Sequence, residues 1–147
     1  SQDIALQFVT ITLVGGVICQ PLIGILLDRM NKRLLMNIAV FCTFVCPIII
    51  GVFLGNFYLV ALSCFVWGGA ASGIFSISLT MLGERYTASQ VAGATAILVM
   101  VFECGSLIGP LIGGRVMDIF GPFGFIYTIV FFTFIFLMIS IYRTIRN

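Results

Sequence analysis

The sequence has very little charge and no histidine. Only 8% of its 147 residues are charged and 61% are hydrophobic, with a formal net charge of +2. Soluble domains carry about 25% charged residues to cover their surfaces. This shortage excludes an ordinary soluble domain and indicates that lipid surrounds most of the chain. Without histidine, a nucleotide-binding loop or a hydrolase triad, the sequence suggests no catalytic site, no cofactor and no nucleic-acid partner.

The five cysteines show no metal-binding or disulfide pattern. Cys42 and Cys46 are one helical turn apart, but this spacing suits a metal poorly without nearby histidine or carboxylate ligands. All five lie in apolar stretches, where a cysteine packs as a small apolar side chain. The cysteines are Cys19, Cys42, Cys46, Cys64 and Cys104. No metal site is therefore predicted.

Charge-poor runs divide the chain into five apolar spans, and each has the roughly 20 residues needed to cross a hydrocarbon core. The apolar residues do not alternate with period two, and backbone groups in lipid must bond within the span, so helices are expected. The expected fold is an all-α membrane protein over residues 1–147, with Ser1 or Asp3 capping the first helix. Because Ser1 is not Met, we expect it to lie inside a longer protein. The expected spans are residues 4–27, 34–54, 57–82, 90–116 and 123–142.

Basic residues gather on one side of the expected membrane. Arg115 is the one basic residue near the other side. The basic side carries Arg29, Lys32, Arg33, Arg85, Arg143 and Arg146. By the positive-inside rule this side is cytoplasmic. We therefore expect a multi-pass protein of the inner or plasma membrane, with the start of this chain outside.

Four charged residues lie close together in residues 24–33, GILLDRMNKR, between the first two spans. This segment resembles the signature loop of the major facilitator superfamily: Gly, three residues, Asp, Arg or Lys, any residue, Gly, then two basic residues. Five of six defining positions match, namely Gly24, Asp28, Arg29, Lys32 and Arg33. Asn31 replaces the usual Gly. Asn is the next most tolerant residue for a left-handed turn, so we expect the loop geometry to survive.

The resemblance implies that these residues form a cytoplasmic latch. In the family this Asp interacts with the N-terminal end of a neighbouring helix and with basic residues, which closes the cytoplasmic side. The link after the third span, GERYTASQ, lies on the same side, so Glu84 is expected to pair with Arg29 or Lys32, and Arg85 with Asp28. The alternative is that these charged residues only set the orientation of the spans in the membrane and end a helix.

The fourth span contains GSLIGPLIGG, which is similar to a Gly-x-x-x-Gly-Pro-x-x-Gly-Gly motif best known in proton-coupled exporters of the same family. Three of its glycines fall nearly on one helical face, where a neighbouring backbone can approach closely. Pro110 removes one helical hydrogen bond and favours a bend. The alternative is ordinary glycine-rich packing. The expected bend and packing residues are Gly105, Gly109, Pro110, Gly113 and Gly114.

Two further polar residues are candidates for a proton or substrate path. Glu103 lies near the middle of the fourth span, where a charged side chain costs roughly 2.5–3.5 kcal/mol. It is either a proton carrier or a hydrogen-bonded acid between helices. Gln20, beside Pro21, is a polar point in the first span. The hydroxyls of Ser76, Ser78 and Thr80 are expected to bond back to their own helix.

The resemblance covers the whole chain in order and implies part of a twelve-helix secondary transporter with two six-helix halves. A charge-free third span with Trp67 favours helices eight to twelve, whereas the Gly-Pro motif is commoner in helices two to six. The implied function is proton-coupled movement of an unknown small solute by alternating access, with the lipid bilayer and the other half as partners. A membrane anchor or assembly protein is the main alternative. A channel is disfavoured because no ring of charged or carbonyl groups is visible.

Overall fold

The computed structural model describes residues 2–146, so the expected capping by Ser1 lies outside the described residues. Over this range the chain is helical, with five α-helices and one 3-10 turn. The helices are α1 (Gln2–Arg29), α2 (Lys32–Val52), α3 (Phe57–Arg85), α4 (Ala88–Phe120) and α5 (Gly124–Arg146), with η1 (Gly121–Phe123) between the last two. The all-helical prediction is confirmed, and each helix lies over one of the apolar runs.

Polar residues and one glycine interrupt the helices. Asn31 and Asn56 are the N-caps of α2 and α3, and each side-chain oxygen accepts a backbone N–H of the first turn. Between α4 and α5 the chain reverses at Gly121, whose φ of 69° favours glycine. Gly124 is also required, because a Cβ there would lie 2.5 Å from the carbonyl oxygen of Val116.

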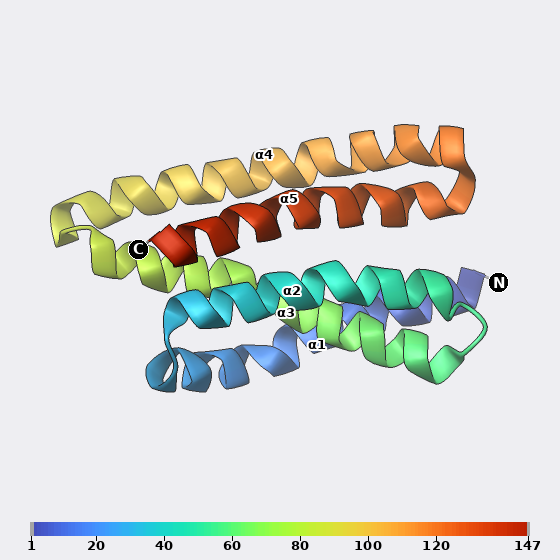
Figure 1. Cartoon of the computed structure of the whole chain (residues 1–147), viewed down its shortest axis with the longest axis horizontal. Coiled ribbons are helices and arrows are strands. Elements are labelled where there is room, and N and C mark those ends of the chain that lie inside the picture. Colours follow the sequence, from blue (N-terminus) through green and yellow to red (C-terminus); the bar gives the residue numbers. More distant parts are fainter. Residues whose placement is uncertain (1, 147) are drawn as a thin grey trace.

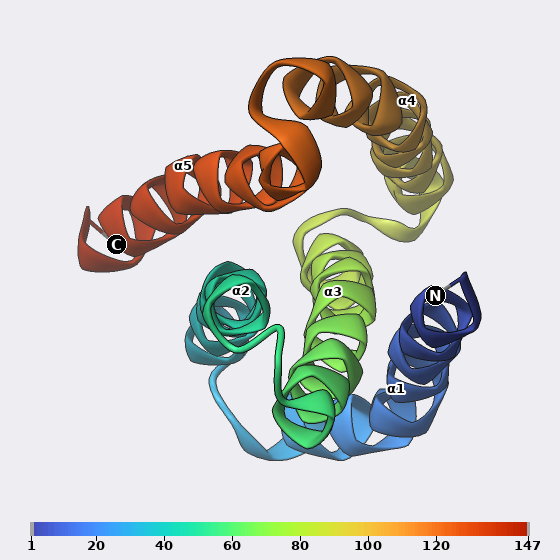
Figure 2. The ribbon, with the colours of Figure 1, turned by 90° about the vertical axis from the view of Figure 1, so that its right-hand side faces the viewer.

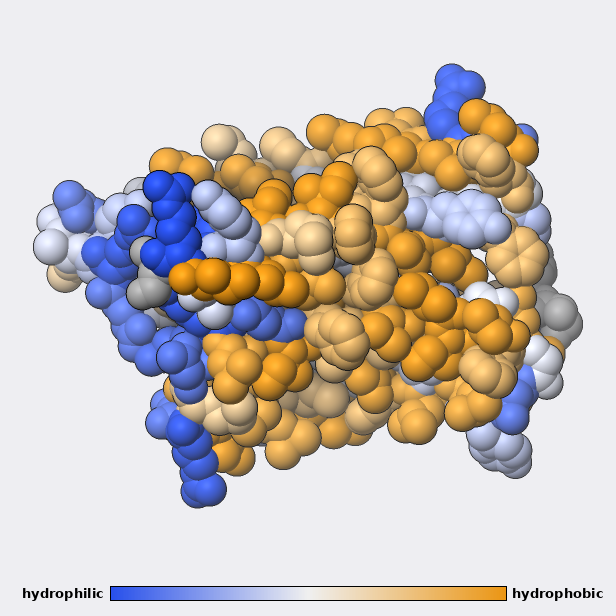
Figure 3. All heavy atoms as spheres, in the orientation of Figure 1, coloured by the Kyte–Doolittle hydropathy of each residue, from blue (hydrophilic) through white to orange (hydrophobic). Residues whose placement is uncertain are grey.

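By length and composition, four continuous helical stretches between residues 2 and 146 are apolar enough to cross a membrane. The last of them, Ala88–Arg146, contains both α4 and α5, which run side by side in opposite directions (Figure 1). Figure 3 shows apolar residues over the middle of the molecule and hydrophilic residues towards its ends. The hydrophilic end on the left carries the α1–α2 link, the α3–α4 link and the end of α5. We call it the basic end.

Helices that follow one another in the chain are not always neighbours in the fold. α3 packs against α1 and α2, while α5 packs against α2 and α4. Viewed along the helices, α1, α3 and α2 form one curved group, and the α4–α5 pair meets it mainly through α5 and α2 (Figure 2). α4 is therefore the most exposed helix, and Gly113 is its one buried residue among those described.

The closest helix contact joins α1 and α3 through glycines. A Cβ added at Gly15 would lie 2.8 Å from the carbonyl carbon of Phe65, and one at Gly68 would lie 2.8 Å from that of Thr12. Both positions are buried, so the two backbones touch directly. Ser72 strengthens this contact, because its hydroxyl donates to the carbonyl oxygen of Gly16 at 3.2 Å.

The main apolar cluster lies where α1 ends, α2 begins and α3 approaches its end. Its buried members are Leu27, Leu35, Ala39 and Ile77, and Ile77 is completely buried. Leu27 and Leu35 flank the α1–α2 link on either side. The charged loop at the basic end therefore lies next to an apolar cluster formed by three helices.

Candidate functional site

The α1–α2 link is shorter than the signature loop suggests. α1 ends at Arg29 and α2 begins at Lys32, which leaves Met30 and Asn31 between them. Asn31 has φ −63° and ψ 120°, and its Oδ1 accepts the backbone N–H of Arg33 at 2.9 Å. The left-handed turn expected at Asn31 is therefore wrong. The side chain caps α2 instead, and an N-cap adopts an extended backbone.

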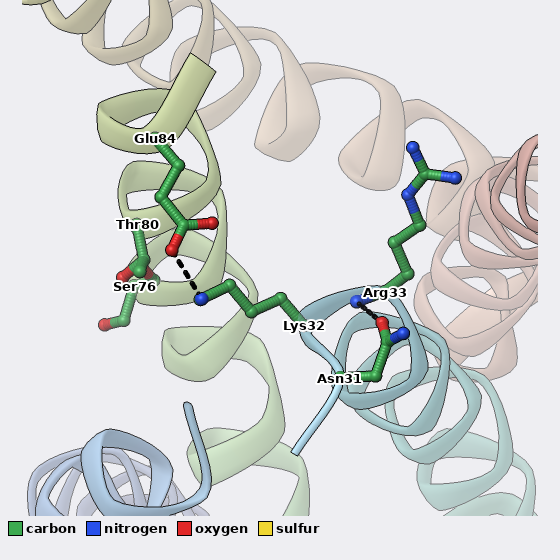
Figure 4. A network of polar contacts seen from close by, with 6 residues as sticks. All are labelled: Asn31, Lys32, Arg33, Ser76, Thr80 and Glu84. Carbon is green, nitrogen blue, oxygen red and sulfur yellow. Dashed lines mark hydrogen bonds and ion pairs between the residues drawn. The ribbon is translucent and has the colours of Figure 1, made fainter. Parts of the chain in front are cut away.

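Lys32 and Glu84 form an ion pair across the basic end, as Figure 4 shows. The Lys32 Nζ lies 2.5 Å from Glu84 Oε1, with the Lys32 side chain 28% exposed and the Glu84 side chain 59% exposed. Lys32 comes from the start of α2 and Glu84 from the last turn of α3, so the pair ties two helix ends together. Of the two partners expected for Glu84, the structure selects Lys32 over Arg29.

The second expected pair, Asp28 with Arg85, is not formed between the described residues. Successive residues of an α-helix point about 100° apart, so Arg85 points in a different direction from Glu84, which meets Lys32. Asp28 lies in the last turn of α1 with its side chain exposed. Gly24, one turn earlier, is also open, because an added Cβ would meet nothing within 4 Å in residues 2–146.

The glycine motif of α4 lies mostly on open surface. Among the described residues, nothing lies within 4 Å of a Cβ placed at Gly105, Gly109 or Gly114. Gly113 differs, because a Cβ there would lie 3.5 Å from the Phe125 ring on α5. Helix α4 continues through Pro110 as one assigned helix. The close backbone approach predicted for this face is therefore not made by α1, α2, α3 or α5.

Glu103 is exposed on the surface of α4. Its Oε2 accepts the Ser106 hydroxyl at 3.3 Å, one turn further along the same helix. A buried position between helices, one of the two readings of this residue, is not what the described residues show. Beside it, the Phe102 ring contacts Phe75 of α3, with ring centroids 5.0 Å apart.

Gln20 lies in an open groove along the α1–α3 contact. The groove has a volume of about 910 Å³. It is lined by Thr12, Leu13, Gly16, Val17, Gln20, Pro21, Trp67, Gly68, Ala71 and Ser72. We call it the α1–α3 groove. The Thr12 and Ser72 hydroxyls already donate to backbone oxygens. The Gln20 amide and the Trp67 indole N–H have no hydrogen-bond partner within residues 2–146, so they are the groove's available polar groups.

The hydroxyls of the third span bond to their own helix, as expected. Ser76, Ser78 and Thr80 each donate to the carbonyl oxygen four residues earlier on α3. Ser76 and Thr80 lie below Glu84 in Figure 4 and carry no contact to Lys32. These hydroxyls are therefore structural. In the described chain no group of three or more His, Cys, Asp or Glu residues could hold a metal ion, and all five cysteines are free.

Sequence reasoning missed that Trp67 lines the groove and that glycines bring α1 and α3 into contact beside it. Trp67 was noted only for the choice between the two halves of a transporter. Gly15, Gly68 and Gly69 are buried at the α1–α3 contact, and a Cβ at Gly69 would lie 2.5 Å from the Cys19 sulfur. Glycines recurring on both spans were the available indication. Their pairing across two helices, however, depends on which helices become neighbours.

Comparison with known proteins places these features in a family. A model of the Major Facilitator Superfamily matches residues 2–146. An uncharacterized MFS-type transporter of Yersinia enterocolitica serotype O:8 / biotype 1B, YE1530, is 30% identical over 104 residues, which cover 71% of this chain and 26% of the relative. The uncharacterized MFS-type transporter YfkF of Bacillus subtilis is 25% identical over 116 residues, which cover 79% of this chain and 29% of the relative.

No solved structure matches the chain. The chain spans between 26% and 29% of the length of the two curated relatives. The match to the family model nevertheless runs from the start of α1 to the end of α5 and includes the charged loop, the Lys32–Glu84 pair and the glycine motif of α4. This chain belongs to the Major Facilitator Superfamily, and its helices are an integral membrane bundle of that family.

Proposed function

We propose that this chain is part of a proton-coupled secondary transporter that moves a small solute across the inner or plasma membrane by alternating access. The observation that carries the proposal is the Lys32–Glu84 ion pair, which joins the signature segment to the end of α3. It joins α2 to α3 at the end where basic residues gather. We assign the chain to helices eight to twelve of such a transporter and the basic end to the cytoplasm.

The latch acts by biasing a balance between two states. A pair as exposed as Lys32 and Glu84 contributes about 0–1 kcal/mol. Two conformations that differ by a few kcal/mol are shifted measurably by contributions of this size. Asp28 and Arg29 are exposed beside the pair and are free to engage the other half of the protein. In this view the cytoplasmic side opens when those contacts break.

The solute binds in the α1–α3 groove. Helix midpoints lie near the bilayer centre, and Gln20 and Trp67 lie in the middle parts of α1 and α3. An amide without a hydrogen-bond partner is costly in hydrocarbon, so the Gln20 side chain is expected to face water or solute. The groove is lined by ten residues of which none is charged. It has the size of a small-molecule site, which is usually about 300–1,000 Å³.

Glu103 is the proposed proton carrier. It is the one acid in the central part of α4, and its described partner is the Ser106 hydroxyl of the same helix. An exposed carboxyl group at membrane depth is expensive unless it faces a polar cavity or another helix. In the complete transporter this face of α4 therefore meets a polar cavity or the other half.

The test measures access to the groove and needs no knowledge of the solute. Ala71, a small groove residue, is changed to Cys in a full-length protein whose native cysteines are replaced by alanine. A membrane-impermeant maleimide is then applied to right-side-out and inside-out vesicles. Alternating access predicts labelling from both sides, since each state opens the groove to one side. Asp28→Asn should raise cytoplasmic labelling and lower outside labelling, with normal membrane insertion.

The matched control is Asp118→Asn, which removes an acid near the C-terminal end of α4, away from the basic end. It should leave the ratio of the two labelling rates unchanged. A membrane anchor or assembly protein predicts no labelling from either side, or equal effects of the two substitutions. Either result would refute the proposed function.

A further inference from the structure

Helices α2 and α5 are joined along their length by three different contacts. At the end away from the basic end, a Cβ at Gly51 would lie 3.2 Å from the Ile126 side chain, so the two helices are close there. In the middle, the rings of Phe44 and Phe134 have centroids 5.8 Å apart. Towards the basic end the contact becomes polar and centres on Asn37. This last contact shares no residue with the Lys32–Glu84 pair.

Asn37 uses both ends of its amide across the interface. Its Oδ1 accepts the Ser140 hydroxyl at 2.5 Å, and its Nδ2 donates to the Thr144 hydroxyl oxygen at 3.1 Å. The Thr144 hydroxyl in turn donates to the backbone carbonyl of Ser140 at 2.9 Å, which closes a ring of hydrogen bonds. We call Asn37, Ser140 and Thr144 the amide clamp. Asn37 is half-buried, so its bond to Ser140 is partly shielded from solvent, whereas its bond to Thr144 is exposed.

The position of the clamp connects it to the latch. Asn37 lies five residues after Lys32 on the same helix, which is about 7.5 Å along its axis. Ring contacts and glycine contacts are non-directional, so they permit small sliding or rotation of α2 against α5. A side-chain amide has fixed donor and acceptor directions, and a single asparagine of this kind fixes the register of paired helices in coiled coils. The Asn37 bonds therefore restrict how α2, the helix that carries Lys32, can rotate against α5.

We infer that Asn37 is a positioning residue for the latch: through Ser140 and Thr144 it holds α2 in the register at which Lys32 reaches Glu84, so that the α4–α5 pair moves with the latch. This inference rests on the proposed function. α2 then bonds to α3 through Lys32 and to α5 through Asn37. Because α3 and α4 share few contacts, coupling between the three-helix group and the α4–α5 pair passes mainly through this α2–α5 contact.

The experiment uses the same groove-labelling assay in the full-length protein with the Ala71→Cys reporter. Asn37→Leu removes both bonds and keeps the number and branching of the side-chain heavy atoms, and it should raise the ratio of cytoplasmic to outside labelling by about twofold to tenfold, the range expected for losing hydrogen bonds. Lys32→Gln should give a similar change. The double variant should give little more than either single variant, because both substitutions release the same end of α2.

Two milder variants protect the test against misfolding of Asn37→Leu. Ser140→Ala removes one bond and should raise the ratio, whereas Ser140→Thr keeps the hydroxyl and should restore it. Thr133→Val is the matched control, because the Thr133 hydroxyl donates only to backbone oxygens of α5 itself. It should leave the ratio unchanged even if it lowers the melting temperature.

The outcomes separate this inference from the proposed function. Labelling that shifts with Lys32→Gln but not with Asn37→Leu or Ser140→Ala would overturn the clamp and leave the transporter intact. Strict additivity of Asn37→Leu and Lys32→Gln would also overturn it, because independent effects do not share one helix end. Absence of labelling from either side in every variant would overturn the proposed function and the clamp together.

Discussion

Replacing each of two adjacent glycines of α1 by alanine should have different effects on the stability of the protein. A Cβ at Gly15 would lie 2.8 Å from the Phe65 carbonyl carbon, whereas one at Gly16 would have its nearest neighbour at 3.6 Å, an ordinary contact. Carbon atoms pack comfortably at about 3.5–4.0 Å, so Gly15→Ala must part α1 and α3 by about 0.7–1.2 Å. Gly16→Ala requires no such movement.

The magnitude follows from three contributions. Overpacking of this kind costs about 1–3 kcal/mol. The Ser72–Gly16 hydrogen bond, 3.2 Å long, would stretch beyond bonding distance and cost about 0.5–1.5 kcal/mol more. Alanine offsets about 0.5–1 kcal/mol because it is the better helix former. Gly15→Ala should therefore lower stability by about 0.5–4 kcal/mol, and Gly16→Ala should leave it unchanged or slightly raised.

The assay is reversible unfolding of the full-length protein in mixed micelles, followed by circular dichroism as the denaturing detergent is increased. Gly83→Ala is a second control, because a Cβ there meets nothing within 4 Å between residues 2 and 146. Equal losses for Gly15→Ala and Gly16→Ala would refute the reasoning. So would a stability gain for Gly15→Ala, since it would mean that the backbones of α1 and α3 are not in contact.

Three further experiments test the basic end and the proton path. Asn31→Ala should lower stability by about 1 kcal/mol, and Asn31→Gly by only a few tenths, because glycine is also tolerated at an N-cap; detergent unfolding measures both. A double-mutant cycle of Lys32→Gln and Glu84→Gln should give a coupling energy of about 0–1 kcal/mol that falls as salt rises, and a salt-independent value would contradict a surface ion pair. Glu103→Gln should abolish the response of transport to a pH gradient, measured with a pH-sensitive dye inside vesicles; retained coupling would leave this residue without a proton role.

The number of helices and their approximate limits could be predicted because lipid imposes a simple rule. Charge is so costly in hydrocarbon that the positions of charged residues mark where spans end. Asn56 illustrates the finer detail: it separates the second and third spans in the sequence, and the structure shows it capping α3. The sequence predicted that Glu84 pairs with Arg29 or Lys32, because all three lie near span ends that were expected on the same side of the membrane, and the structure selects Lys32.

Helix neighbours were not predictable from one sequence. Apolar faces look alike in lipid, so nothing in the composition of α1 indicates that it packs on α3 more than on α2. The backbone of Asn31 was predicted wrongly because tolerance of a left-handed turn was considered without its capping ability, and capping prevailed. The role of Asn37 was missed because its partners are about a hundred residues away on α5.

The order in which the helices pair has a consequence for biosynthesis. α1 packs chiefly on α3 and barely touches α2, so α1 and α2 cannot form a stable pair with each other. The glycine surface of α1 must wait until residues 57–85 have left the ribosome before it finds its partner. During that interval the α1 surface lacks the α3 partner that covers it in the folded bundle, and transiently exposed surface of this kind favours misassembly. A ribosome pause between α2 and α3 would therefore lengthen the time for which α1 lacks this partner.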